Sequence, residues 1–156
     1  MIVPREMIGT LRFPEYLSCG EDFWFVLRLF INAATIVKIP EPLYYYYQGN
    51  GDSITHTLST DVHKRYLIAA ADNRSFLEKV GLFEPLEKPF YWSMLRFKSV
   101  FCLNQDTFGL YKEEFPEANR YVLSCPLLTW KMKILMISLN LNLDTAASWI
   151  VRIYRK

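Results

Sequence analysis

The most informative stretch of the chain is residues 20–34, which read Gly20-Glu21-Asp22-Phe23-Trp24-Phe25-Val26-Leu27-Arg28-Leu29-Phe30-Ile31-Asn32-Ala33-Ala34. Phe23, Leu27 and Phe30 recur at i, i+4 and i+7, which places apolar side chains along one face of a helix. Glu21 and Asp22 fall in the first turn, where exposed backbone N–H groups and the helix dipole favour negative charge. The stretch therefore predicts a helix from residue 21 to residue 33 or 34, with two carboxylates at its start.

The residues after this helix have the composition of β-strands. Residues 35–39 are mostly β-branched, Pro40-Glu41-Pro42 predicts a turn, and residues 43–48 include four consecutive tyrosines. The two runs are expected to pair as a hairpin or to lie in different parts of a sheet. They predict a small β-element over about residues 35–48.

The remainder of the chain has the pattern of helices. An apolar stripe from residue 58 to residue 80 ends at Gly81, a typical C-terminal stop. Further helices are predicted from residue 84 or 88 to 104, and over 108–115, 116–123, 128–139 and 145–154, with Asp144 as the N-cap of the last. A short helix is also expected over residues 2–11. The predicted fold class is therefore α+β, mostly helical, with a small β-element followed by a helical bundle.

Five pieces of sequence occur in a suggestive order in the first third of the chain. They are Phe13-Pro14-Glu15, Gly20-Glu21-Asp22, Arg28, Glu41-Pro42-Leu43-Tyr44-Tyr45-Tyr46 and Ser53-Ile54-Thr55. In this order the pieces resemble the C-terminal part of the catalytic domain of a family 2 glycosyltransferase, an inverting enzyme with a GT-A fold. The resemblance implies that residues 1–58 form the acceptor-side end of a GT-A-like domain and that residues 59–156 form a helical C-terminal region.

The chain departs from the family in one important respect. Family members begin with a nucleotide-binding half that carries an Asp-x-Asp metal motif, and no Asp-x-Asp occurs among the 156 residues. We therefore expect a chain without the nucleotide-binding half, whether natural or cut, that is inactive alone. The complete enzyme would transfer a sugar from a nucleotide-sugar to a saccharide or lipid-linked acceptor, as in the synthesis of bacterial polysaccharide.

The resemblance assigns roles to particular residues. Asp22 matches the general base, which removes a proton from the attacking acceptor hydroxyl, and Glu21 would bind the acceptor or support its loop. The substrate-binding candidates are Trp24, Arg28 and Tyr46, and the metal-ligand candidate is His56. A divalent metal, Mn²⁺ or Mg²⁺, is expected in the complete enzyme and none in this chain alone. The competing interpretation makes Glu21 and Asp22 helix stabilisers and His56 an exposed loop residue.

The amino-acid composition limits the kinds of partner and compartment that we expect. Hydrophobic residues make up 51% of the chain and charged residues 22%, as in a folded globular domain. The net charge is +2, and no basic patch is dense enough to predict a nucleic-acid partner. Cys19, Cys102 and Cys125 share no Cys-x-x-Cys spacing, which favours a reducing compartment.

Two further expectations concern membranes and association. The C-terminal tail is basic and apolar, which predicts either a peripheral contact with an anionic membrane or a core-packing helix pair with a solvated end. We therefore expect a cytoplasmic protein, soluble or peripheral at the inner face of the membrane. An unpaired strand edge and an apolar face would favour self-association. The alternative functional class is a non-catalytic helical protein-interaction module.

Overall fold

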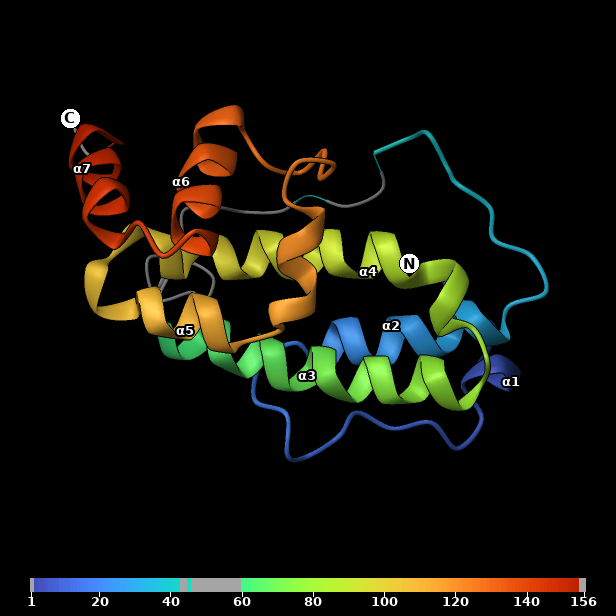
Figure 1. Cartoon of the computed structure of the whole chain (residues 1–156). Helices are drawn as coiled ribbons and strands as arrows, with labels where there is room; N and C mark the ends of the chain where they lie inside the picture. Colours follow the sequence, from blue (N-terminus) through green and yellow to red (C-terminus); the bar gives the residue numbers. More distant parts are fainter. Residues whose placement is uncertain (1, 43–44, 46–59, 155–156) are drawn as a thin grey trace.

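The structure is a computed structural model that describes residues 2–42, 45 and 60–154. Within these residues every regular element is a helix (Figure 1). The elements, with η denoting a 3-10 helix, are α1 Arg5–Ile8, α2 Glu21–Asn32, α3 Thr60–Lys79, α4 Phe83–Lys98, η2 Ser99–Leu103, η3 Gln105–Thr107, α5 Phe108–Glu113, η4 Pro116–Tyr121, α6 Trp130–Asn140 and α7 Asp144–Tyr154.

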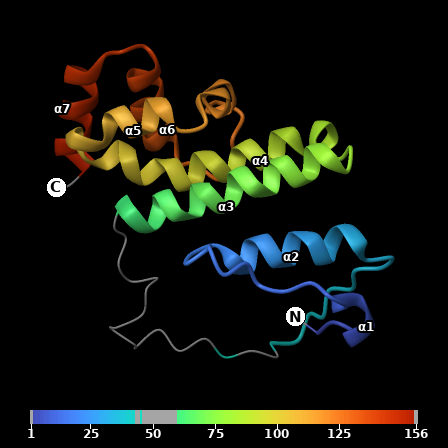
Figure 2. The same ribbon diagram turned by 90° about the horizontal axis from the view of Figure 1, so that it is seen from below.

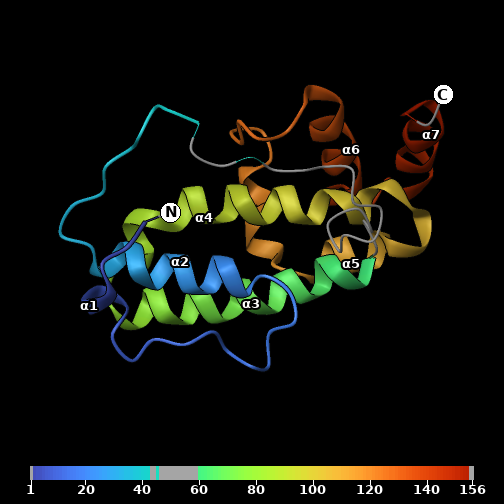
Figure 3. The ribbon, with the colours of Figure 1, turned by 180° about the vertical axis from the view of Figure 1, so that it is seen from behind.

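The helices form three layers around the pair α3 and α4 (Figure 2). α1 and α2 lie on one side of that pair, and α5, α6 and α7 lie on the other side. The view from behind shows α2 running alongside α3 (Figure 3). The N-terminal layer is therefore attached to the rest of the molecule mainly through α3.

The main core lies between α3, α4 and the shorter helices that follow. Tyr91, Phe101, Tyr111 and Leu135 have side chains with at most 1% of their surface exposed. Burying one large apolar side chain stabilises a fold by about 1.5–3 kcal/mol relative to leaving it exposed. The Lys98 side chain is fully buried beside this core, and its ammonium donates to the Phe115 carbonyl at 3.1 Å and to Asn119 Oδ1 at 2.8 Å.

Gly81 ends α3 and turns the chain into α4. Its φ is 71°, its N–H donates to the Glu78 carbonyl at 3.1 Å, and the Leu82 N–H donates to the Leu77 carbonyl at 2.9 Å. This pattern satisfies carbonyls at the helix end that would otherwise lack a partner. The predicted stop at Gly81 is confirmed.

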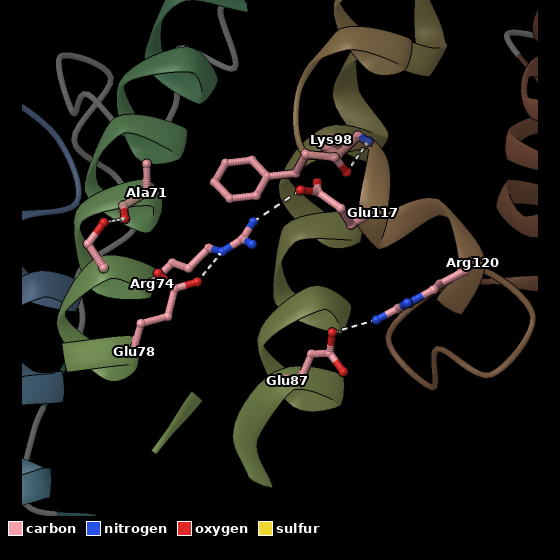
Figure 4. Close-up of polar contacts among 9 residues, drawn as sticks. Ala71, Arg74, Glu78, Glu87, Lys98, Glu117 and Arg120 are labelled. Carbon is pink, nitrogen blue, oxygen red and sulfur yellow. Dashed lines mark hydrogen bonds and ion pairs between the residues drawn. The ribbon is translucent and has the colours of Figure 1, made fainter. Parts of the chain in front are cut away.

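Ion pairs join η4 to both central helices (Figure 4). Arg74 on α3 lies 2.9 Å from Glu78 and 3.2 Å from Glu117 of η4, and Arg120 of η4 pairs with Glu87 on α4. Because these side chains are partly exposed, the pairs contribute little to stability. They link η4 to α3 and to α4.

The predicted α+β fold is wrong, because no strand occurs in the part of the chain that the structure describes. Residues 33–42 belong to no regular element, and Ile36, Val37 and Ile39 are 60%, 77% and 50% exposed. A β-branched run becomes a strand only where another strand accepts its hydrogen bonds and a core covers one face. Among the described residues neither is present for residues 35–42, so a GT-A-like sheet is not supported. Residues 43, 44 and 46–48 of the predicted β-element lie outside the described residues.

Several helix predictions are confirmed, with shifted ends. α2 begins at Glu21 as predicted, and α6 and α7 occupy the two C-terminal segments expected to be helical. The N-terminal helix is shorter than expected, because α1 spans only Arg5–Ile8. Asp144 lies inside the first turn of α7 and pairs with Lys112 at 2.8 Å. None of the described helices combines the length and apolar character that crossing a membrane requires.

Candidate functional site

Gly20 fixes the start of α2 on α3. Its backbone is left-handed, with φ 78° and ψ 10°. A Cβ at this position would lie 3.0 Å from Ala69 Cβ and 3.0 Å from Tyr66 Cδ1. Any other residue would therefore strain the backbone and also meet α3. The glycine of Gly-Glu-Asp thus allows the close approach that places the two carboxylates.

Asp22 lies exposed in the first turn of α2, and Glu21 beside it is partly buried. Asp22 Oδ1 accepts a hydrogen bond from the Phe23 N–H at 2.7 Å. This contact satisfies one of the N–H groups that a helix start leaves without a partner. The same carboxylate keeps further acceptor capacity on its exposed side. The position therefore suits a stabilising role and also a role in binding or proton transfer.

The surroundings of Cys19 show that this end of α2 carries negative charge. Burial raises the pKa of the Cys19 thiol, and the charges of Glu21, Asp22 and Asp61 raise it further, while Arg65 lowers it. The thiol therefore stays protonated near neutral pH, which argues against Cys19 as a nucleophile. Arg65 is held by Asp61 at 2.7 Å and by Ser18 Oγ at 3.0 Å.

A polar clamp of Trp24, Arg28, Asp72 and Asn73 joins α2 to α3. Arg28, only 9% exposed, donates to Asn73 Oδ1 at 2.7 Å and to the Trp24 carbonyl at 3.0 Å. Its guanidinium lies 3.6 Å from the centre of the Trp24 ring and 4.4 Å from that of Phe76. The Trp24 indole N–H donates to Asp72, which lies 3.7 Å from the Arg28 guanidinium. The planar guanidinium is therefore stacked and hydrogen-bonded at once, which an ammonium could not reproduce.

Asp72 is the acceptor at the centre of this clamp. Burial raises the pKa of its carboxyl, but hydrogen bonds from Tyr16 and Trp24 and the charge of Arg28 outweigh burial and lower the pKa. The Tyr16 hydroxyl donates to Asp72 at 2.6 Å, and this bond raises the pKa of Tyr16. Asp72 therefore stays ionised and holds three groups of the N-terminal layer against α3.

The predicted site residues divide into three groups. Asp22 and Glu21 lie at the exposed start of α2. Trp24 and Arg28, predicted to bind substrate, are turned toward α3 and take part in the polar clamp. Tyr46 and His56 lie outside the described residues. The structure thus brings the first four together on one helix.

Sequence analysis missed Tyr16, Asp72 and Asn73. One signal was present, because Asn73 stands in the predicted apolar stripe between Ala69 and Phe76. A polar residue on a buried helix face needs a hydrogen-bonding partner. Arg28, on the facing apolar helix, was the available cation.

The described residues do not fit a bound metal ion. Within residues 2–42, 45 and 60–154, no group of three or more His, Cys, Asp or Glu side chains lies close enough to hold one. Divalent cations bound by protein oxygen atoms usually take several ligands.

An apolar groove lies at the opposite end of α2. Its volume is about 490 Å³, and it is lined by α1, the end of α2 and the irregular segment after it. Most of its walls are apolar, including Ile2, Met7, Leu29 and Ile36. The groove is far more apolar than the start of α2, so one helix joins two chemically different surfaces.

Comparison with known proteins gives no relative. No family model matches the chain, and neither a curated protein nor a solved structure matches it.

Proposed function

We propose that this chain is the acceptor-side part of a glycosyltransferase that moves a sugar from a nucleotide-sugar donor to a saccharide or lipid-linked acceptor. The observation that carries the proposal is the position of Asp22. Its carboxylate is exposed at the first turn of α2. Gly20 and the polar clamp fix the position of that helix on α3. A general base must be both accessible and held in place.

In this proposal each residue of the Gly-Glu-Asp stretch has a separate task. Asp22 accepts the proton of the acceptor hydroxyl as that oxygen attacks the anomeric carbon, and the bond from that carbon to the phosphate oxygen breaks, so that the nucleotide leaves with the electron pair. Glu21 accepts a hydrogen bond from a second acceptor hydroxyl or supports the turn. Trp24 and Arg28 act indirectly, because their contacts with Asp72 and Asn73 hold α2 in register with α3. The nucleotide-sugar is bound by residues outside this chain.

Saccharide binding tests the proposal directly. Isotope-labelled protein is titrated with a panel of oligosaccharides and lipid-linked sugars, and amide shifts are followed by NMR. The expected result is a response at residues 20–24 with one class of acceptor, weakened in Asp22→Asn. Asp106→Asn is a matched control, because Asp106 is also exposed and the same change in charge is made in η3, outside α2. Saccharide shifts confined to other surfaces, or none with any sugar, would contradict the proposal.

The proposal also predicts that this chain alone does not bind nucleotides. A ligand that binds only the native state raises the melting temperature by mass action. Nucleotide-sugars and free nucleotides, with and without Mn²⁺, are expected to leave the melting temperature of this chain unchanged. A metal-dependent increase with one nucleotide would show that the donor site lies in the chain, and the assignment as the acceptor-side part would fail.

The apolar groove favours a second candidate function, a helical protein-interaction module. The groove has a volume of about 490 Å³ and mostly apolar walls. Such a surface suits an inserted apolar segment better than a sugar. In such a module Asp22 only stabilises a helix start. Asp22→Asn should then cost about 0.5–1 kcal/mol of stability and change no binding. In the glycosyltransferase reading, the same substitution also abolishes transfer once the nucleotide-binding part is supplied.

A further inference from the structure

α6 is apolar on two opposite faces. One face enters the core through Met132, Leu135, Met136 and Leu139, each at most 9% exposed. The other face carries Trp130, Ile134 and Leu141, which are 68%, 46% and 64% exposed. These three residues stand at i, i+4 and i+11, so they follow one line along the helix and its C-terminal cap. A helix that only covers a core needs one apolar face, and the second is left unexplained by the fold.

The loop that leads into α6 extends the exposed apolar surface. Leu123 and Leu127 are 73% and 47% exposed. Lys133 on α6 donates to the Leu123 carbonyl at 2.8 Å, which holds this loop against the helix. Leu123, Leu127, Trp130, Ile134 and Leu141 together are called the outward surface of α6. Large exposed apolar areas of this kind commonly mark an interaction site.

The loop and α6 carry basic side chains and no acidic ones. Between residues 118 and 143 the sequence contains Arg120, Lys131 and Lys133 and no Asp or Glu, and of these Arg120 is paired with Glu87 of α4, which leaves the two lysines beside the outward surface. The Lys131 ammonium lies 5.9 Å from the centre of the Trp130 ring. Exposed aromatic and aliphatic side chains flanked by basic ones are typical of helices that lie in the interface of an anionic bilayer. There the apolar groups enter the headgroup boundary, while lysine ammonium groups remain at the lipid phosphates.

We propose that the outward surface of α6 docks on the surface of an anionic lipid bilayer, with the helix lying in the plane of the membrane. Charge complementarity selects this partner over a second copy of the chain. A symmetric dimer through this surface would bring the lysines of both copies together with no acidic residue of residues 118–143 to pair them. The proposal stands independently of the proposed transferase activity.

Vesicle flotation tests the proposal with a closely matched pair of variants. Ile134→Glu places a negative charge on the outward surface, and Ile68→Glu makes the same change on α3. The two isoleucines are 46% and 57% exposed, so neither change removes a buried side chain. Figures 1 and 2 place α3 on the other side of α4 from α6. Circular dichroism and melting temperature confirm that both variants remain folded.

The wild-type chain is expected to float with vesicles of phosphatidylcholine and phosphatidylglycerol and not with phosphatidylcholine alone. Raising the salt concentration should weaken binding, because screening reduces the attraction of the lysines. Ile134→Glu should weaken binding by about tenfold, and Ile68→Glu should leave it unchanged. Equal binding by Ile134→Glu, or no wild-type binding to anionic vesicles, would overturn the proposal. Self-association that Ile134→Glu abolishes, without vesicle binding, would identify a protein interface instead.

Discussion

The N-terminal layer differs from the body of the molecule because it adds directional polar contacts to its apolar packing. The body, α3 to α7, has a continuous apolar core in which aromatic and aliphatic side chains are almost fully buried. The N-terminal layer, α1 and α2 with the loop between them, packs Phe23, Leu27 and Ile31 against that core as partly buried side chains, and it adds the polar clamp and the close approach at Gly20. Figure 2 shows this layer on the face of α3 away from α5, α6 and α7.

The difference separates stability from positioning. Apolar burial is roughly proportional to area and has little directional preference. A stacked guanidinium with fixed hydrogen bonds works only in one geometry, so it sets the register of α2 on α3. The register of α2, which carries Asp22, is thus set by a few polar residues. The free energy of unfolding of the protein depends mainly on the buried apolar side chains of the core. Changes in the two regions should have distinguishable effects.

The largest expected effect belongs to the body. Phe101 is fully buried, and Phe101→Ala should reduce the free energy of unfolding by about 3–5 kcal/mol, because it leaves a cavity in the core. Urea denaturation followed by circular dichroism measures this change. The matched comparison is Phe30→Ala on α2, where Phe30 is 45% exposed and the cost should stay below about 1 kcal/mol. Equal costs at both positions would remove the contrast between the two regions.

Breaking the clamp comes next in size. Arg28→Ala removes the donor to Asn73 Oδ1, and the Nδ2 of the same side chain already lacks a partner in the described structure. The unsatisfied buried polar groups should lower the free energy that holds the N-terminal layer on α3 by about 2–3 kcal/mol. Arg28→Lys should recover little, because lysine cannot stack and donate in the same geometry. Recovery of full stability by lysine would show that charge alone holds the helix.

Lys98 gives the body a pH dependence on the alkaline side of neutral pH. Burial lowers the pKa of Lys98 from 10.5 to about 8. Between pH 8 and 10.5 the unfolded chain binds more protons than the folded one, so stability should rise with pH by about 2 kcal/mol. The groups that face Lys98 are Glu114, Glu117, Cys102 and Tyr111, and burial raises the pKa of the last two. Neither of those two is therefore expected to titrate in this range.

The pH effect is measured as a difference between two proteins. Melting temperatures are recorded from pH 7 to pH 10 for the wild type and for Lys98→Met, which cannot titrate at this position. The wild type should gain stability relative to Lys98→Met as the pH rises. Parallel curves would mean that Lys98 is protonated in the folded and unfolded states alike.

The smallest effect concerns the start of α2. Gly20→Ala forces a side chain into a left-handed backbone and against Ala69 and Tyr66, and should cost about 1–2 kcal/mol. Gly109→Ala is the matched control, because a Cβ there would meet no atom within 4 Å. Thermal denaturation of both variants measures the difference. A Gly20→Ala protein as stable as the wild type would show that α2 can shift on α3 without loss.

Local signals explain which parts of the fold could be predicted. The start of α2 follows from Gly20, two acidic residues and a regular apolar spacing, all within a few positions of one another. The run at residues 35–39 misled for the opposite reason, because a strand depends on a partner that composition does not reveal. The end of α3 at Gly81 was predictable, because a glycine directly after an apolar stripe is a local signal for the C-terminal end of a helix.

The site was predictable only in part, for a related reason. The carboxylates of Glu21 and Asp22 are visible in the sequence, and so are Trp24 and Arg28. Their partners Asp72 and Asn73 lie more than 40 residues further along the chain. Local patterns do not connect such positions, so Trp24 and Arg28 were predicted to face substrate. Asn73 within an apolar stripe was the one indication that α3 receives a polar partner.

Native-state hydrogen exchange is the most direct test of the account, because it reports opening free energies helix by helix. Amides of α2 are expected to exchange through a smaller opening free energy than those of α4 and α6. In Arg28→Ala, protection should fall in α2 and remain unchanged in α4 and α6. If α2 exchanged only with global unfolding, and Arg28→Ala lowered protection equally in all three helices, the N-terminal layer would not be a separately held unit.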